Sequence, residues 1–339
     1  MTPGVPSSHV LPTSAATLAT MTTTTIAIGS LTASPGARVT GVVPVDVGMA
    51  TIDVPVVIVH GSRPGPRVAV TAGIHGAEYV SIAALREVVL GLDPSTVTGS
   101  LVAVLTASPA AFAARAIYIN PLDGLNLNRQ FPGDMNGSPT QRLAHWLTTT
   151  VIAGSDAFVD MHCGDMNEAL DSFTGIQETG DASVDARSRE LAEAYGLRYL
   201  LVARTSGTTL AAAGGFGIPA VLGEVGGQGL WPKEHVALHA AGFRRVLRAA
   251  GLVDDAPATP AHRTESLPTE AWMRATTPGY WHPAVAVGDR VAAGVVVGEV
   301  QDAFGTVLER PSASMDGVVI FLVSSLAMNA GDPLLALAG

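Results

Sequence analysis

Two short segments of the sequence carry side chains that together could bind a catalytic metal ion. His75 and Glu78 lie three positions apart in HGAE, and His162 lies in DMHCGD. On the first turn of a helix, residues three apart share one face, so His75 and Glu78 could reach one ion. Two imidazoles and one carboxylate form a ligand set for catalytic zinc that leaves the fourth position to water. The pattern predicts one zinc ion per chain, although HGAE alone is also typical of a helix start, where the dipole favours a glutamate.

The neighbours of His162 have separate predicted roles. In an extended strand, Asp160 faces the same way as His162, so its carboxylate could orient the imidazole; a hydrated, solvent-facing carboxylate is the alternative. Cys163 would point to the opposite face of the strand. We therefore expect Cys163, the one cysteine of the chain, to be a small buried hydrophobic side chain and not a fourth ligand.

Two further segments supply candidates for substrate binding and proton transfer. Asn128 and Arg129, in NLNRQFPG, offer amide donors and a planar guanidinium that suit bidentate binding of a carboxylate. Alternatively, the arginine stabilises a long loop by bonding backbone carbonyls. Glu224, in GEVGGQG, could take a proton from water at the metal and pass it to a leaving amine. The alternative is an exposed glutamate at the end of a strand.

The elements that must position these residues follow from the apolar patterning. Buried strands are predicted over 67–74, 100–106, 157–162, 199–203 and 220–224. Helices are predicted over 75–92, 140–152, 182–195 and 234–250, and a long ordered loop over 108–139. This alternation favours an α/β fold with a mostly parallel or mixed sheet flanked by helices. Three of the strands end at the candidate residues, where ligands bind in open α/β sheets.

The chain is predicted to contain two folded parts. Residues 1–25 are expected to be a disordered leader, with Met21 as an alternative start, and residues 26–265 a catalytic domain. A linker is expected over 254–268. Beyond it, short apolar runs separated by Gly or Pro predict a small all-β sandwich or barrel over 266–339.

Composition and charge exclude several classes of protein. The 339 residues are 47% hydrophobic and 14% charged, with a formal net charge of −10. This apolar content excludes a disordered chain, and the lack of a basic cluster argues against nucleic-acid binding. No apolar run approaches the ~18–20 residues that span a bilayer, and the first 25 residues lack the positive region of a secretory signal. We expect a cytoplasmic enzyme with a small-molecule substrate, no nucleic-acid or membrane partner, and possible homo-oligomers.

The order of the motifs resembles one known family. HGAE, NLNR with FPG, D-x-H-x-GD and a strand-end GE-x-GG-x-G, followed by a small β domain, resemble the succinylglutamate desuccinylase/aspartoacylase family of zinc carboxypeptidase-like hydrolases. The stretch DMHCGDMNEALDSF is most similar to the bacterial branch near the ectoine-pathway deacetylases. The resemblance implies zinc ligands at His75, Glu78 and His162. It also implies a general base at Glu224 and carboxylate binding at the adjoining pair Asn128 and Arg129.

One position departs from the family pattern. Members usually have a further arginine shortly before NLNR, which polarises the carbonyl that is attacked. Here the stretch reads AIYINPLDGLNLNR. Arg115 lies nearby and is one candidate replacement; Tyr118, which could donate a hydrogen bond to the developing oxyanion, is the other.

Together these observations predict a zinc-dependent amide hydrolase that removes an acyl group from a small N-acylated amino acid or amine. Two alternatives remain at this stage. One is a metallocarboxypeptidase that acts on short peptides by the same chemistry. The other is a non-catalytic zinc-binding or solute-binding protein on the same scaffold. If the substrate is small, residues 270–339 are expected to narrow the entrance to the site.

Overall fold

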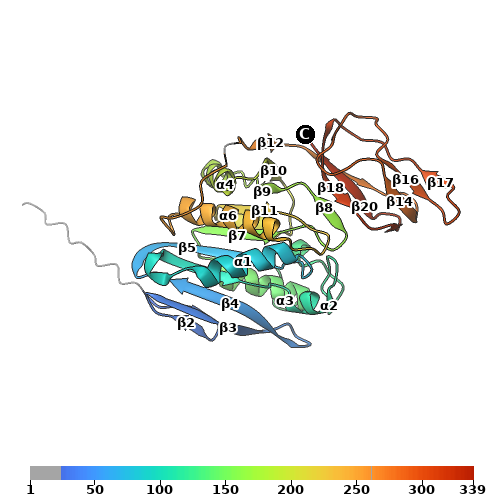
Figure 1. The fold of residues 1–339 in the computed structure, drawn as a ribbon. Helices are drawn as coiled ribbons and strands as arrows, with labels where there is room; N and C mark the ends of the chain where they lie inside the picture. Colours follow the sequence, from blue (N-terminus) through green and yellow to red (C-terminus); the bar gives the residue numbers. More distant parts are fainter. Residues whose placement is uncertain (1–23, 261) are drawn as a thin grey trace, which may run out of the picture.

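A nine-stranded mixed sheet forms the centre of the larger part of the molecule (Figure 1). The computed structural model describes residues 24–260 and 262–339, so the predicted leader, apart from residues 24 and 25, lies outside the described residues. From one edge to the other, the strands are β12 (Glu265–Leu267), β10 (Tyr199–Ala203), β9 (Phe173–Gln177), β11 (Ala220–Glu224), β7 (Ala157–His162), β5 (Arg63–Ala72), β6 (Thr98–Val104), β4 (Thr51–His60) and β3 (Ala37–Asp46). A separate hairpin joins β1 (Ile26–Ile28) and β2 (Leu31–Ala33).

The central strands are buried on both faces, which explains their continuous apolar runs. All six residues of β7 are buried. Its Val159 packs in one core cluster and its neighbour Phe158 in the other, as the two-residue period of a strand requires. β7 pairs in parallel with both β5 and β11. The carboxyl ends of these three strands therefore lie side by side at one edge.

Helices cover both faces of this sheet. One face carries α1 (Tyr79–Gly91), α4 (Ala182–Tyr195) and α6 (Lys233–Ala249). The other carries α3 (Pro139–Trp146), its continuation as a π-helix η3 (Leu147–Ile152), and α5 (Thr209–Gly215). Shorter helices occur at η1 (Pro94–Thr96), α2 (Pro109–Ala114) and η2 (Leu127–Arg129). The predicted α/β fold with a helix-flanked mixed sheet is confirmed.

The C-terminal part is all β, as predicted. One sheet has the order β13-β20-β18-β15 and the other β17-β16-β14-β19, with antiparallel neighbours. The strands are β13 (Glu270–Arg274), β14 (Gly279–Pro283), β15 (Arg290–Val291), β16 (Gly298–Gln301), β17 (Val307–Glu309), β18 (Gly317–Val323), β19 (Ala327–Met328) and β20 (Pro333–Ala338). They enclose a core cluster to which Trp281 and the buried residues of β18 and β20 contribute, and Tyr199, Leu201 and Leu267 of the main sheet pack in the same cluster.

Two strand pairings link the main part and the C-terminal part of the chain. β12 lies within the segment expected to be a linker, yet it pairs in parallel with β10 at the edge of the main sheet. In return, β8 (Glu168–Leu170) leaves the main part and pairs with β18. The predicted boundary after residue 265 falls inside β12, because the chain uses this segment to cover the edge of β10 before entering the second part.

Several elements differ from the sequence expectations. The helix expected from His75 begins at Tyr79, so HGAE lies in the turn before it. The region between the predicted strand 157–162 and the predicted helix 182–195 contains β8 and β9, and the region between the predicted strands 199–203 and 220–224 contains α5. The long loop 108–139 contains α2 and η2. These elements are short, and their pairing partners are distant in sequence, so local periodicity did not indicate them.

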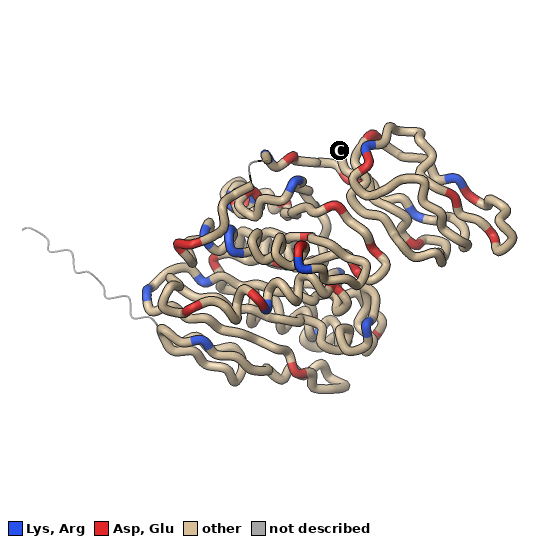
Figure 2. The backbone as a smooth tube through the Cα atoms, in the orientation of Figure 1, with Lys and Arg blue, Asp and Glu red and all other residues tan. Residues whose placement is uncertain are grey.

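Charged residues are interspersed along both parts of the described chain (Figure 2). Within the described ranges, no helix combines the length and the apolar character that crossing a bilayer requires.

The buried side chain of Tyr195, the last residue of α4, packs between the main sheet and α6. The ring of Tyr195 is fully buried, and two glycines contact it from opposite elements. A Cβ added at Gly223 on β11 would lie 2.5 Å from the ring, and one added at Gly242 on α6 would lie 2.2 Å from it. Both glycines are therefore required by close approach to the ring.

Gly242→Ala is predicted to destabilise the protein by about 1–3 kcal/mol, the usual cost of overpacking a core. The buried ring of Tyr195 has no space into which it can move. Urea unfolding followed by circular dichroism measures the change. Gly91→Ala is the matched control, since it also lies in a helix but a Cβ there meets nothing within 4 Å; it should cause no loss of stability. Equal midpoints for G242A and wild type would contradict this account of the packing.

Candidate active site

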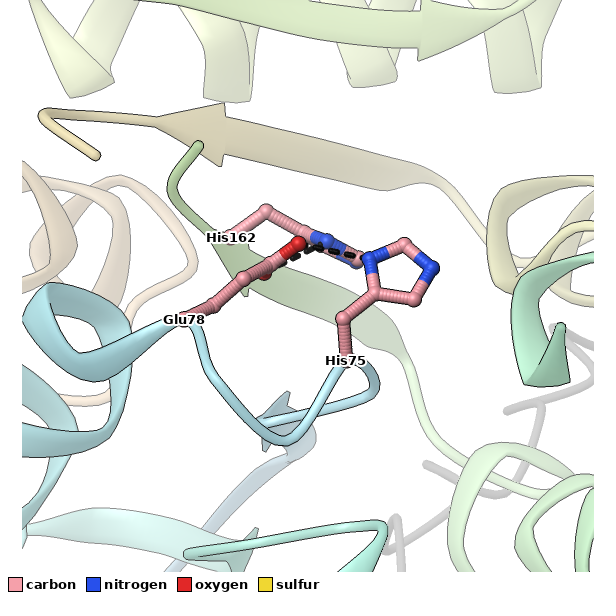
Figure 3. A group of neighbouring side chains, drawn as sticks. All are labelled: His75, Glu78 and His162. Atoms are coloured by element: carbon pink, nitrogen blue, oxygen red, sulfur yellow. Dashed lines mark hydrogen bonds and ion pairs between the residues drawn. The ribbon is translucent and has the colours of Figure 1, made fainter. Parts of the chain in front are cut away.

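His75, Glu78 and His162 meet at the carboxyl ends of β5 and β7 (Figure 3). The two oxygens of Glu78 lie 2.6 Å from His75 Nδ1 and 2.9 Å from His162 Nδ1. One ligand atom from each of the three residues lies within 4.8 Å of the others. Glu78 and His162 are buried, and His75 is partly buried. The structure thus brings the three predicted ligands into one group that could hold a metal ion.

The way in which His75 and Glu78 approach differs from the expectation. They do not share a helix face, because Glu78 is the N-cap residue of α1 and His75 lies in the turn after β5. Gly76 between them packs tightly on α2, where a Cβ would lie 2.1 Å from the backbone nitrogen of Phe112. This contact requires glycine and holds the turn so that both side chains face His162.

The second nitrogen of each imidazole is bound to an oxygen acceptor. His75 Nε2 lies 3.1 Å from Asn126 Oδ1, and His162 Nε2 lies 2.9 Å from Asp160 Oδ2. With hydrogen on Nε2, each ring donates to its acceptor and directs Nδ1 toward Glu78, and Nδ1 can coordinate a cation once it has lost its own proton. Such acceptors fix the tautomer and orientation of metal-binding histidines. Asp160 therefore has the orienting geometry expected for it, whereas Asn126 was not singled out, although it lies in the NLNR motif.

Asp160 is itself held in place. Its carboxylate accepts a hydrogen bond of 2.7 Å from the Thr71 hydroxyl on β5 and another from the Thr209 hydroxyl on α5. The side chain is fully buried. Cys163 is also buried, as expected, and its backbone N–H donates to Glu78 Oε2 at 3.2 Å.

A buried chain of hydrogen bonds also fixes the backbone of His162. His239 on α6 places Nε2 2.9 Å from the His162 carbonyl oxygen and Nδ1 2.6 Å from the Tyr195 hydroxyl. Burial lowers the pKa of His239 to about 3, so its ring is neutral and can donate from Nε2 while accepting at Nδ1. His239 was not singled out from the sequence, although it lies within the predicted helix 234–250.

The charges of the cluster stabilise one another. Burial raises the pKa of Glu78, but the adjacent His162 and His75 outweigh it and hold the pKa at about 2. Burial lowers the pKa of His162, but Asp160 and Glu78 outweigh it and raise the pKa well above its ordinary value. The Glu78 carboxylate is therefore ionised, and a cation held by the cluster would replace protons on the imidazoles.

Glu224 lies directly beside His162 in the sheet. The two residues are register partners on the parallel strands β11 and β7. Oε2 of Glu224 is buried and has no hydrogen-bond partner among the residues that the structure describes. Burial raises the pKa of Glu224 well above its ordinary value, although His162 acts in the opposite direction. A carboxyl group with a raised pKa next to a cation-binding cluster is typical of an acid–base residue.

A cavity of about 590 Å³ opens beside the cluster. Asn128, Arg129 and Tyr118 line it together with the cluster and Glu224. Asn128 is buried, and its Oδ1 accepts from the backbone N–H of Thr209 at 2.9 Å. This contact turns the amide nitrogen away from α5. A larger cavity of about 790 Å³ lies near β12 but contains none of the cluster residues.

The two candidate replacements for the polarising arginine lie in different surroundings. Arg115 follows α2 in the left-handed conformation, is exposed, and is not among the residues that line the cavity. The position of Arg115 therefore argues against the role expected for it. Tyr118 does line the cavity, and its buried hydroxyl has no hydrogen-bond partner within the described part of the chain. The backbone of Tyr118 has an unusual φ of 61°. Its N–H donates a hydrogen bond of 2.9 Å to Asp165 Oδ2, which stabilises this conformation.

Fold and site define a class of protein. The structure superposes on a succinylglutamate desuccinylase/aspartoacylase from Rhodobacter sphaeroides with a TM-score of 0.81 and 26% identity, covering 89% of this chain and 95% of that one. It shares its fold with the product-bound ectoine utilization protein EutE from Ruegeria pomeroyi, with a TM-score of 0.82 and 23% identity over 90% and 96% of the chains.

The sequence relatives identify the family. The profile of the succinylglutamate desuccinylase/aspartoacylase catalytic domain matches residues 64–250. An N-alpha-acetyl-L-2,4-diaminobutyric acid deacetylase from Halomonas elongata is 30% identical over 294 residues, which cover 84% of this chain and 85% of the relative. The chain belongs to the succinylglutamate desuccinylase/aspartoacylase family, and the expected resemblance is confirmed.

Asp160→Asn is predicted to weaken zinc binding about 10–100-fold, the usual effect of losing an acceptor behind a metal-binding histidine. The amide cannot hold the His162 imidazole as the carboxylate does. Competition with a chromogenic chelator measures the affinity. Asp254→Asn, at a side chain that is 93% exposed, is the matched control and should bind zinc as the wild type does. An unchanged affinity in D160N would show that Asp160 does not orient His162.

Proposed function

We propose that this protein is a zinc-dependent amide hydrolase that removes an acyl group from a small N-acylated amino acid or amine. The observation that carries the proposal is the register pairing of Glu224 with His162, beside two further side chains able to hold a metal ion. The family membership and the similarity to a curated N-acetyl-diaminobutyrate deacetylase support it.

The donor set fits zinc. His75, His162 and Glu78 would supply two nitrogens and one carboxylate, which is a composition found in catalytic zinc sites. The remaining nitrogens of both rings already have acceptors, so each Nδ1 is directed toward the cluster. When bound, zinc supplies Lewis acidity that polarises a carbonyl oxygen and lets water lose a proton near neutral pH.

Glu224 is suited to move the proton. A general base must accept a proton from the attacking water and later return it to the leaving amine. The raised pKa of Glu224 favours the protonated form after the first transfer, and its unpartnered Oε2 is available for a hydrogen bond to water or amine.

Three other side chains are suited to hold the substrate. Asn128 and Arg129 would bind a carboxylate, and Arg129 is further fixed by a 2.7 Å hydrogen bond from Nη1 to the Asn128 carbonyl oxygen. The hydroxyl of Tyr118 lies near the Glu168 carboxylate and would donate its hydrogen to an oxyanion in competition with that group. Burial and the neighbouring Glu168 raise the pKa of Tyr118, so this hydroxyl stays protonated and can donate.

The shape of the cavity favours a small substrate over a peptide. Glu270, Trp272 and Arg274, at alternate positions of β13, line the cavity from the C-terminal part, and so do Ile320 and Phe321 of β18. A wall at this position limits the length of chain that can extend beyond the scissile bond. Assays of N-acyl amino acids against short peptides would separate the deacylase from a metallocarboxypeptidase.

Glu224→Gln is predicted to keep stoichiometric zinc but to lose at least 10²-fold in kcat, since general acid–base catalysis typically contributes 10²–10⁴-fold. The amide has nearly the same shape and cannot accept the proton. Steady-state hydrolysis of N-acetyl amino acids and metal analysis provide the two measurements. Glu234→Gln, the same change at an exposed position of α6, is the control and should retain full turnover.

Two results would contradict the proposal. Near-full turnover in E224Q would show that Glu224 does not transfer the proton. Stoichiometric zinc without turnover of any acyl-amine by the wild type would favour a non-catalytic zinc-binding or solute-binding protein.

Tyr118→Phe is predicted to lower kcat about 10²-fold or more with a small change in KM, because an oxyanion donor acts mainly in the transition state. Comparison of kcat and KM for one N-acetyl amino acid tests it. Tyr280→Phe, at an exposed tyrosine of β14, serves as the control. A change confined to KM would instead assign Tyr118 to ground-state binding.

A further inference from the structure

The floor of the cavity is apolar on the side away from the metal-binding cluster. Alternate residues of β11, β9 and β10 face the cavity: Leu222 and Glu224, Phe173 and Gly175, Leu201 and Ala203. In the sheet register, Gly175 is the partner of both Leu222 and Leu201. These three residues form one row across the sheet, which we name the apolar row. Glu224 lies two residues further along β11, opposite Phe173.

Gly175 makes the apolar row hollow at its centre. A Cβ built at this position would meet only Leu222, at 3.6 Å, which is ordinary van der Waals contact. Gly175 is absent from the residues with positive φ, so the backbone itself does not require glycine. The missing side chain therefore serves to leave space between Leu222 and Leu201.

The wall that faces this floor is apolar as well. Leu170 on β8 pairs with Phe321 on β18, and both line the cavity. The ring of Trp272 packs on Phe321 with 4.8 Å between centroids. A charged group placed on the apolar row would lose hydration without gaining a partner, which is costly, whereas a hydrocarbon group would gain from burial.

Charged side chains also line the cavity, and Glu270 and Arg274 lie on either side of Trp272 on β13. Burial and the like charge of Arg274 lower the pKa of Arg129, while Glu270 acts in the opposite direction, so these three charges lie close enough to influence one another. Glu270 and Arg274 are exposed. The cavity therefore offers charged side chains for a carboxylate and, on the floor formed by the sheet, the apolar row.

The apolar row lies two residues before Glu224 on β11, away from the end of the strand. Two residues along a strand span about 7 Å, whereas a methyl carbon lies only about 1.5 Å from the carbonyl carbon of an acetyl group. A group that covers the row must extend several carbons from the scissile amide.

From this geometry we infer that the substrate carries an apolar group of about four or more carbons, seated on the row Leu222–Gly175–Leu201. The inference rests on the proposed deacylase function and specifies its substrate class. The apolar group belongs either to the acyl chain or to the side chain of the amino acid. Gly175 is then the residue that determines how large this group can be.

A substrate panel with the zinc-loaded full-length protein tests the inference. N-acetyl-L-alanine is compared with N-acetyl-L-leucine and N-acetyl-L-phenylalanine in one arm and with N-butanoyl- and N-hexanoyl-L-alanine in the other. We expect kcat/KM to rise about fourfold for each methylene group that becomes buried, and at least tenfold across one arm. The arm that shows the rise identifies whether acyl group or side chain occupies the row. A flat or falling series in both arms would overturn the inference while leaving the deacylase function intact.

Gly175→Leu fills the hollow and should lower the ratio of kcat/KM for the preferred long substrate to that for N-acetyl-L-alanine by at least tenfold. Gly215→Leu is the matched control, because Gly215 is exposed at the end of α5, meets nothing within 4 Å and does not line the cavity. Its ratio should equal that of the wild type. Should G175L fail to fold, Gly175→Ala, whose Cβ makes an ordinary contact, should lower the ratio in the same direction. An unchanged ratio in a folded variant would overturn the role of Gly175.

A binding measurement distinguishes failure of the inference from failure of the proposed function. If the wild type hydrolyses nothing in the panel, the deacylase proposal fails, and calorimetric titration with acetate, butanoate and hexanoate decides the inference alone. Hexanoate binding at least tenfold more tightly than acetate supports the apolar row as a binding site. Equal affinities overturn it.

Discussion

The carboxylate of Glu78, buried between two imidazole rings, is the interaction around which the site is organised. A buried charge is costly unless it is paired and hydrogen-bonded. Here Oε1 faces His75, and Oε2 faces His162 and the backbone N–H of Cys163. The pairing holds two segments that are far apart in the sequence at one point, the end of β7 and the turn before α1. The two imidazoles that stabilise this buried charge are also those that, together with Glu78, could hold a cation.

The main sheet determines the geometry around this pair. His162 and Glu224 face the same cavity because β7 and β11 are parallel and in register. A shift of β11 by one residue would turn Glu224 to the opposite face, toward α6. The fully buried Tyr195, confined by glycines of β11 and α6, and its hydrogen bond to His239 hold both strands relative to the helices that cover them. Tyr195 and His239 therefore contribute both to the packing of the core and to the hydrogen bonds that support the site.

Much of the fold could be predicted from the sequence, because its main strands are strongly apolar and clearly bounded. The strands 157–162, 199–203 and 220–224 and the helix 182–195 have the expected bounds. The helix start at His75 was wrong, since a tight contact between Gly76 and α2 holds the preceding turn, and no periodicity reveals such a contact. β9 was missed for a similar reason: FTGIQ has little apolar pattern, and its stability comes from β10 and β11 on either side.

The candidate metal ligands could be predicted from the sequence, because the spacing of the residues and the ends of the predicted strands indicated them. The acceptor role of Asn126 and the support from His239 depend on side-chain directions that only the folded chain defines.

The pairing of strands across the two parts has a consequence for how the chain can be divided. β10 would be an edge strand of the main sheet without β12, and β18 would lose β8. An unpaired edge presents a row of free N–H and C=O groups to other molecules, and proteins cover such edges to avoid aggregation. Either half produced alone would expose a strand that the other half now shields. β12 and β8 thus cover these strand edges, and separating the two parts of the chain would uncover them.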